Sequence, residues 1–201
     1  MDDYLKLVIR QQAIFQNVLV YANNEFDKER YEEIRDIACH LMEYKTDLAV
    51  TNFFGNEKGY QTPKIDTRAA VFKDDKILLV YENNDTRALP NGWCDALESV
   101  KSNIINEVNE KVGLQVDAVK LIVVQDRNKH NSPVYAYGVC KIFVLCKVVG
   151  GSFKKNNETI ETNYFSLDDI HKNLTNEKIT LEQNKLCFKA NNNPNFETYF
   201  D

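Results

Sequence analysis

Residues 89–114 read LPNGWCDALESVKSNIINEVNEKVGL, and this stretch decides the fold that we expect. Its opening Leu-Pro-Asn-Gly predicts a loop, Ser99 can cap the helix that follows, and Gly113 stands where a helix C-cap would fall. Glu107 and Glu110 are three residues apart, so they share one face of that helix. Carboxylates held in this way suit a hard divalent cation, which takes oxygen ligands and leaves positions open for phosphate oxygens. The alternative is a solvated acidic helix face.

Strand and helix patterns alternate around this stretch. The segments with the composition of strands are 67–72, 76–81, 119–126, 135–149 and 161–166. Asp74-Asp75 predicts a turn between the first two strands. Thr180 followed by Gln183 is a capping-box pattern, which opens a final helix that we expect to run to about Ala190. These elements predict an α/β (α+β) protein with a mixed sheet.

The N-terminal part predicts a helix over residues 3–22 whose apolar side chains cover two faces. These side chains are Leu7, Ile14, Val18 and Tyr21 on one face, and Tyr4, Val8, Phe15 and Leu19 on the other. A helix apolar on two sides is buried on two sides, so we expect a homodimer built partly on it. Asp27 is the expected N-cap of a second helix, and residues 45–55 are expected to form a third. The predicted domains are 1–60, which is helical, and 64–201.

The composition excludes several classes of protein. The chain has 201 residues, of which 43% are hydrophobic and 27% are charged, as in soluble globular proteins. Its net charge of −5 argues against a nucleic-acid partner, which needs a basic face. No apolar run approaches the roughly 18 residues of a membrane span, and the acidic N-terminus does not resemble a secretory signal. We therefore expect a cytoplasmic protein whose five cysteines are reduced thiols rather than zinc ligands.

The stretch at 89–114 resembles the Nudix box: Gly, five residues, Glu, seven residues, Arg-Glu, an apolar residue, any residue, Glu-Glu, any residue, Gly and an apolar residue. The residues that match this pattern are Gly92, Glu98, Glu107, Val108, Glu110, Gly113 and Leu114. The segments KIDTRAAVFKDDKILLV, QDRNKH, NNETIETNYFSLDD and NFETYFD resemble the subgroup of Nudix hydrolases with a helical N-terminal domain. The resemblance implies a mixed sheet between helices, and metal binding by Gly92, Glu98, Glu107 and Glu110.

Two residues depart from the box, because Asn106 replaces its Arg and Lys111 replaces the second Glu of its Glu-Glu pair. In the family that Arg is expected to hold box carboxylates in place, and that Glu is usually a metal ligand. Three interpretations of Lys111 stay open. In the first, its ammonium stands for a metal ion on a bridging pyrophosphate. In the second, metal and most catalysis are lost while nucleotides still bind. In the third, Lys111 points to solvent while weakened activity survives.

Other candidate site residues lie outside the box, namely Glu158, Glu161, Arg68, Arg127, Lys129 and His130. Either glutamate could activate water, since a Nudix general base often comes from such a loop; the alternative is a pair of surface acids. Arg68 could hold a phosphate by a bidentate contact or pair with Asp66. The basic loop that contains Arg127 could contact substrate or be solvated. Trp93 is interpreted as a packing residue, and Cys94 as a small filler.

The leading hypothesis is a hydrolase that cleaves the phosphoanhydride of a nucleoside diphosphate linked to X, with CDP-choline or ADP-ribose as the kind of substrate. It would depend on Mg²⁺ or Mn²⁺, with impaired or altered metal use. Glu98, Glu107, Glu110 and Glu161 favour this hypothesis, in which the box glutamates and Lys111 act at the reacting phosphates. Lys111 also favours the alternative, a non-catalytic Nudix-fold protein that binds a nucleotide derivative. A third hypothesis is a dimeric scaffold whose helices carry the function.

Overall fold

The computed structural model describes residues 3–46, 59–83, 86–170 and 174–201. The chain divides into two compact units. The first comprises Met1–Pro63 together with Val134–Gly138, and the second comprises Lys64–Pro133 and Val139–Asp201. No helix in these described ranges is long and apolar enough to cross a membrane.

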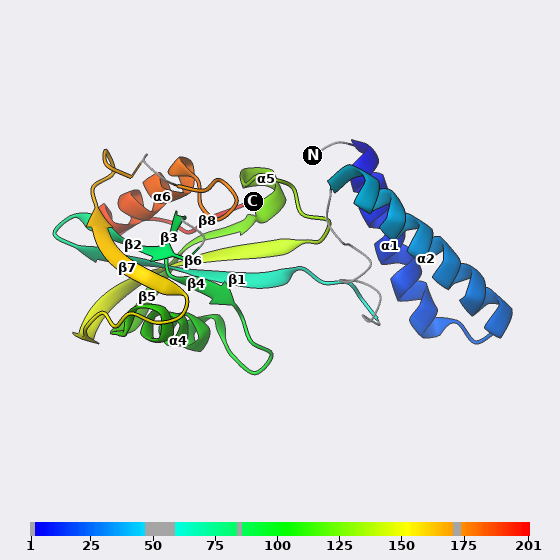
Figure 1. Ribbon diagram of the computed structural model, residues 1–201, viewed down its shortest axis with the longest axis horizontal. Helices are drawn as coiled ribbons and strands as arrows, with labels where there is room; N and C mark the ends of the chain where they lie inside the picture. Colours follow the sequence, from blue (N-terminus) through cyan, green and yellow to red (C-terminus); the bar gives the residue numbers. More distant parts are fainter. Residues whose placement is uncertain (1–2, 47–58, 84–85, 171–173) are drawn as a thin grey trace. The chain divides into compact units, whose positions relative to one another are not determined.

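The first unit is built on two helices, α1 (Asp3–Tyr21) and α2 (Glu25–Thr46), which are drawn in blue in Figure 1. The cap of α2 is Asn24 and not Asp27, because the Asn24 Oδ1 accepts the backbone N–H of Phe26 at 2.9 Å. The expectation for Asp27 was therefore wrong by one turn. Asn24 satisfies an otherwise unpaired N–H of the first turn, whereas Asp27 pairs with Arg30. The third helix expected at 45–55 falls almost wholly outside the described residues.

The core of the first unit includes a segment that the sequence had assigned to a strand. Leu5, Val8, Ala38 and Met42 of the helices form a cluster with Ala136, which is 1% exposed. The strand expected from residue 135 therefore begins only at 139, because the apolar side chains before it pack within the helical unit. On α1 the buried positions are Leu5, Val8, Gln12 and Gln16, and they follow a helical period.

The second unit is a mixed sheet. Its main strands are β1 (Lys64–Lys73), β2 (Lys76–Glu82), β5 (Leu114–Asp126) and β6 (Val139–Gly151). The shorter ones are β3 (Arg87–Ala88), β4 (Asn91–Trp93), β7 (Thr159–Phe165) and β8 (Tyr199–Phe200). The order is β3-β2-β1-β6-β5-β8, with β4 paired to β1 and β7 paired to β2. Since β1 and β6 are parallel while most other pairs are antiparallel, the expected mixed sheet is confirmed.

One helix covers each face of this sheet, as Figure 1 shows for α4 (Val100–Val112) and α6 (Leu181–Asn192). Successive residues of β1 pack alternately against the α4 face and the α6 face of the sheet. Ala69 lies in the cluster that includes Ile104 and Val108 of α4, and Ala70 lies in the cluster that includes Phe188 of α6. This is the alternation that a strand buried on both faces requires. The short helix α5 (Arg127–His130) follows β5 directly.

The helix predicted between 99 and 112 is confirmed together with both of its ends. The Ser99 Oγ accepts the backbone N–H of Ser102 at 3.1 Å, and the Ser102 Oγ accepts that of Ser99 at 2.9 Å. Gly113 adopts φ 76°, the left-handed conformation that favours glycine at a helix end. The predicted Thr180 capping box of α6 is confirmed as well. β8 was not predicted, because it depends on a distant pairing with β5.

Candidate active site

A pocket of about 490 Å³ lies beside the C-terminal half of α4. Its carboxylates are Asp95, Glu107, Glu110 and Glu158, and its cation is Lys111. The backbone around Gly92 and the loop that carries Asn156 complete the lining. Residues from the box and from the segment before β7, about fifty positions apart, therefore meet in one cavity.

At Gly92 the backbone of β4 lies against the Glu107 side chain of α4. A Cβ atom at this position would overlap the Glu107 carboxylate, so only glycine leaves room for that side chain. The approach is fixed by a chain of polar contacts. Thr67 of β1 is paired with Gly92, and the Asn103 Nδ2 donates to the Thr67 Oγ1 at 2.8 Å. The box glycine therefore positions Glu107 by its lack of a side chain.

The Glu107 carboxyl is held in a setting that disfavours its charge. Burial raises its pKa from 4.5 to about 7, while Lys111 lowers it and the carboxylates of Glu110, Glu158 and Asp95 raise it further. Desolvation and like charges both disfavour an ionised carboxylate. A divalent cation would relieve both effects, since it would replace the lost hydration and offset the acidic neighbours.

Lys111 points into the pocket and not into solvent. Its side chain is only 16% exposed, and its Nζ lies 3.3 Å from the Glu158 Oε2. The interpretation in which Lys111 points to solvent is therefore wrong. The lysine joins the box helix to the loop that carries Glu158, within the same cavity as Glu107 and Glu110.

Asn106 retains part of what the box Arg is expected to do. Its Nδ2 donates to the Glu98 Oε1 at 3.2 Å, so one box carboxylate is still held from the helix. A neutral amide gives this contact without a charge, and it can supply fewer donors than a guanidinium. Glu98 is not among the residues that line the pocket.

The two glutamates proposed as general base lie in different surroundings. Glu158 lines the pocket, and its carboxylate pairs with Lys111. Glu161 lies on β7 opposite Tyr81 of β2, and its Oε1 accepts from the Arg87 Nη2 at 3.2 Å and the Asn163 Nδ2 at 2.8 Å. The geometry therefore brings Glu158, and not Glu161, to the box carboxylates.

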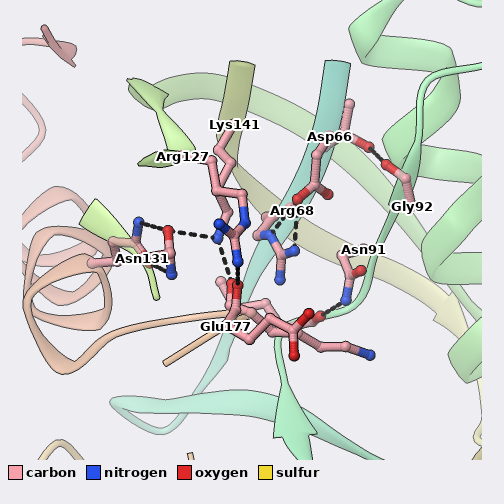
Figure 2. Close-up of polar contacts among 12 residues, drawn as sticks. Asp66, Arg68, Asn91, Gly92, Arg127, Asn131, Lys141 and Glu177 are labelled. Carbon is pink, nitrogen blue, oxygen red and sulfur yellow. Dashed lines mark hydrogen bonds and ion pairs between the residues drawn. The ribbon is translucent and has the colours of Figure 1, made fainter. Parts of the chain in front are cut away.

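Arg68 lies on the other face of the sheet, in the contact that the sequence offered as the alternative. Its Nη2 and Nε donate to the Asp66 Oδ2 at 2.6 and 3.1 Å (Figure 2). Thr67 between them contacts α4, so strand alternation turns Arg68 toward the α6 side. Arg68 is 4% exposed, and its Nη1 has no hydrogen-bond partner among the described residues.

The basic loop is likewise held by contacts within the chain. Arg127, 2% exposed, donates through Nη2 to the backbone oxygen of Glu177 at 3.4 Å. Lys129 and His130 approach the Asp201 carboxylate at 3.8 and 2.7 Å. None of these three side chains lines the pocket of carboxylates. Their contacts tie α5 to a later loop and to the C-terminal tail.

Lys141, which the sequence did not single out, completes the buried group in Figure 2. Its Nζ donates to the Asn131 Oδ1 at 3.1 Å and to the backbone oxygen of Lys178 at 2.5 Å. Burial lowers its pKa from 10.5 to about 6, and the nearby Arg68 lowers it further. We name Asp66, Arg68, Arg127 and Lys141 the buried ionisable group.

The donor set of the pocket suits Mg²⁺ or Mn²⁺ in its chemistry. It offers carboxylate oxygens from Glu107 and Glu110 beside the Gly92 backbone, which are the hard ligands that these ions prefer. Within the part of the chain that the structure describes, no three or more His, Cys, Asp or Glu residues are already grouped as a metal site. The carboxylates share a cavity without being drawn into one coordination sphere.

Four pocket residues were missed or misread from the sequence. Asp95 stands at a variable position of the box and carries no signal of its own. Asn156 and Asn157 lie in an asparagine-rich run that resembles a plain loop. Trp93 was interpreted as packing, but it is 48% exposed and lines the pocket. Its place next to the box glycine was the available signal, because β4 turns it away from the sheet core.

Comparison with known proteins gives matches over both units. Residues 2–52 match the family described as UDP-X-like, N-terminal oligomerisation domain. The chain is 33% identical over 202 aligned residues to the Bacillus subtilis (strain 168) protein named "Putative ADP-ribose pyrophosphatase YjhB". That alignment covers 98% of this chain and 97% of the relative.

Two solved structures extend the comparison. An ADP-ribose pyrophosphatase from Streptococcus suis 89-1591 is 46% identical, covers 70% of this chain and 100% of its own, and superposes with a TM-score of 0.65. A UDP-X diphosphatase is 29% identical, covers 99% of this chain and 98% of its own, and has a TM-score of 0.66. The similarity to the second structure therefore spans the helical unit and the sheet together.

Proposed function

Since the chain belongs to the Nudix hydrolases, in the subgroup with a UDP-X-like N-terminal domain, we propose that it cleaves the phosphoanhydride of a nucleoside diphosphate linked to X. ADP-ribose, UDP-linked sugars and CDP-choline represent this substrate class. The observation that carries the proposal is the pocket in which Glu107, Glu110, Lys111 and Glu158 meet beside Gly92. It offers metal-binding carboxylates, a cation for phosphate and an acid from outside the box.

The residues that would hold Mg²⁺ or Mn²⁺ are Glu107 and Glu110, together with the carbonyl of Gly92. A bound divalent ion supplies an activated water and offsets charge on the phosphates. Lys111 weakens this site by placing a cation among the ligands. Two unit charges about 4 Å apart interact by about 4 kcal/mol at an effective dielectric constant of about 20.

Lys111 and Glu158 have complementary roles in this proposal. The Lys111 ammonium, 3.3 Å from Glu158 before substrate arrives, exchanges that partner for a phosphate oxygen of the substrate. The exchange frees the Glu158 carboxylate, which then accepts a proton from the attacking water at Oε2. The lysine thus neutralises part of the phosphate charge, which in the family pattern is neutralised by metal bound to a second glutamate at this position.

A non-catalytic nucleotide-binding protein is the second candidate, and the same lysine favours it. Lys111 weakens the metal site on which turnover depends, while its ammonium can still contact a phosphate oxygen in the same pocket. Trp93 separates the two candidates because it is the only tryptophan in the chain and lines the pocket, so its fluorescence reports occupancy directly.

The decisive experiment pairs turnover with binding. ADP-ribose, UDP-glucose and CDP-choline are each incubated with Mg²⁺ or Mn²⁺, and phosphorylated products are measured beside quenching of Trp93. The hydrolase proposal expects two phosphorylated products from at least one compound. Quenching without products from any compound would contradict it and support the binding protein.

We also propose that the helical unit forms a homodimer. Leu7 of α1 and Tyr44 of α2 are 70% and 87% exposed within one chain, and the matched family is described as an oligomerisation domain. Burying a large apolar side chain contributes about 1.5–3 kcal/mol. Leu7→Glu should give a folded monomer in sedimentation at a concentration where the wild type sediments as a dimer. A wild type that sediments as a monomer would contradict the proposal.

A further inference from the structure

The loop before β7 is fastened to the end of α4 by one amide side chain. The Asn156 Nδ2 donates to the backbone oxygens of Glu110 and Lys111 at 2.9 and 3.0 Å. The Asn156 Oδ1 accepts the backbone N–H groups of Glu158 and Thr159 at 2.9 and 2.8 Å. One residue therefore joins two of the three pocket residues of the helix, Glu110 and Lys111, to the acid that faces them.

We propose that Asn156 is a positioning residue that fixes Glu158 against the C-terminal turn of α4. This inference rests on the proposed function, in which Glu158 accepts a proton from water. An asparagine amide has two N–H donors and an acceptor oxygen with two lone pairs. All of them are used here, so Asn156 keeps no polar group for substrate although it lines the pocket.

The Asn156 amide supplies hydrogen bonds that both the helix end and the loop otherwise lack among the described residues. The last carbonyls of a helix have no partner inside the helix, and Gly113 satisfies only the oxygen of Asn109. Asn156 covers the next two carbonyls. On the loop side, its oxygen turns the backbone so that the Glu158 carboxylate reaches Lys111 at 3.3 Å.

The other side of the loop is bonded to the sheet, so a change at Asn156 alters the contacts between the loop and α4 and not those with the sheet. The Asn83 N–H donates to the Glu158 backbone oxygen at 3.3 Å, and the Asn83 Nδ2 donates to that of Asn157 at 3.2 Å. These contacts anchor the loop to the end of β2. Without Asn156 the loop would stay attached to the sheet and would keep the Lys111–Glu158 ion pair, but it would lose the amide contacts to the end of α4. The Glu158 carboxylate would then be held less precisely against α4.

The test uses Asn156→Ala and Asn156→Ser in the full-length protein. Serine can still accept the two loop amides but lacks the NH₂ group that donates to the helix. We expect kcat to fall about 10- to 100-fold in both variants, as for outer residues that orient active groups, with KM changed less than about threefold. Asn193→Ala is the matched control, because its Oδ1 also accepts a nearby backbone N–H, at 3.0 Å, near the end of the helix on the opposite sheet face.

Coupling to Glu158 separates positioning from a general loss of structure. In a Glu158→Gln background, Asn156→Ser should lower kcat by less than about twofold, since residues that act as a unit are not additive. Equal losses in both backgrounds, or wild-type kcat in the single variants, would overturn the proposal.

An outcome without turnover is read separately. If the wild type hydrolyses none of the compounds, the proposed function fails, and the fastening is then judged by amide hydrogen exchange. Exchange of the Glu158 and Thr159 amides should be at least about tenfold faster in Asn156→Ala than in the wild type. Unchanged exchange there would overturn the fastening itself.

Discussion

The second unit gathers charged residues in two places that differ in how those residues are satisfied. In the pocket beside α4, carboxylates outnumber the single cation Lys111, and the cavity is open enough to admit a ligand. In the buried ionisable group, Lys141 and Arg127 donate to backbone oxygens, and Arg68 donates to Asp66. Carboxylates that outnumber their cation in an open cavity point to chemistry, whereas buried ionisable groups bonded to the rest of the chain point to structure.

The largest expected effect that sharpens this contrast is that of Glu107→Gln. We expect turnover to fall about a thousandfold, because the amide cannot replace a charged metal ligand. Above pH 7 the variant should also be more stable to unfolding than the wild type. Burial raises the pKa of Glu107 from 4.5 to about 7, so its ionisation opposes folding as pH rises through that window.

The gain in stability for Glu107→Gln is bounded by about 3 kcal/mol and should be smaller because the side chain is partly solvated. Urea unfolding at pH 5 and pH 8, beside steady-state kinetics, checks both halves. A variant that loses activity and is also less stable at pH 8 would contradict this view of the pocket.

Arg68→Met should have the opposite effect: it should lower stability and leave turnover nearly unchanged. It leaves the Asp66 carboxylate buried without its cation, which costs about 3–5 kcal/mol. Thermal unfolding should show the loss, while kcat of the folded protein changes less than about threefold. A folded Arg68→Met protein with wild-type stability and a hundredfold lower kcat would transfer Arg68 from structure to catalysis.

Glu158→Gln and Glu161→Gln form a matched pair on one segment. We expect about a hundredfold loss of kcat for Glu158→Gln, because Glu158 lines the pocket and Glu161 does not. For Glu161→Gln we expect less than about threefold, since the amide oxygen can still accept from Arg87. Steady-state kinetics at saturating substrate distinguishes them, and the reverse order would place the base on β7.

Lys141→Met should have the smallest effect on kcat, and it tests the buried ionisable group through the pH dependence of stability. Burial lowers the pKa of Lys141 from 10.5 to about 6, so folding releases a proton between those values and wild-type stability rises with pH there. Methionine should flatten that rise, with kcat changed less than about twofold. An identical pH dependence in both proteins would mean that Lys141 keeps its proton when folded.

Local signals predicted what depends on neighbours in sequence. Ser99 and Gly113 bound α4 because caps are written in the few residues around a helix end. The cap of α2 is Asn24, one turn before the expected Asp27, which shows that such a signal does not fix the position of the cap itself. The resemblance to the Nudix box likewise predicted that Gly92 and Glu107 belong to one site.

Distant contacts explain what the sequence could not give. Glu158 could not be separated from Glu161 until β7 was seen to pair with β2, which turns one acid to the pocket and the other to Arg87. The direction of Lys111 depends on the same loop. Arg68 pairs with Asp66, and strand alternation points its side chain away from α4.

The central claim is that Lys111 stands as a cation among the metal-binding carboxylates, and Lys111→Glu with Mn²⁺ calorimetry tests it most directly. The change shifts the local charge by two units toward the family pattern, so we expect Mn²⁺ to bind at least about tenfold more tightly. A nucleotide such as ADP-ribose should bind more weakly than to the wild type when metal is absent. Unchanged Mn²⁺ affinity together with unchanged metal-free nucleotide binding would contradict the claim, because position 111 would then lie outside the site.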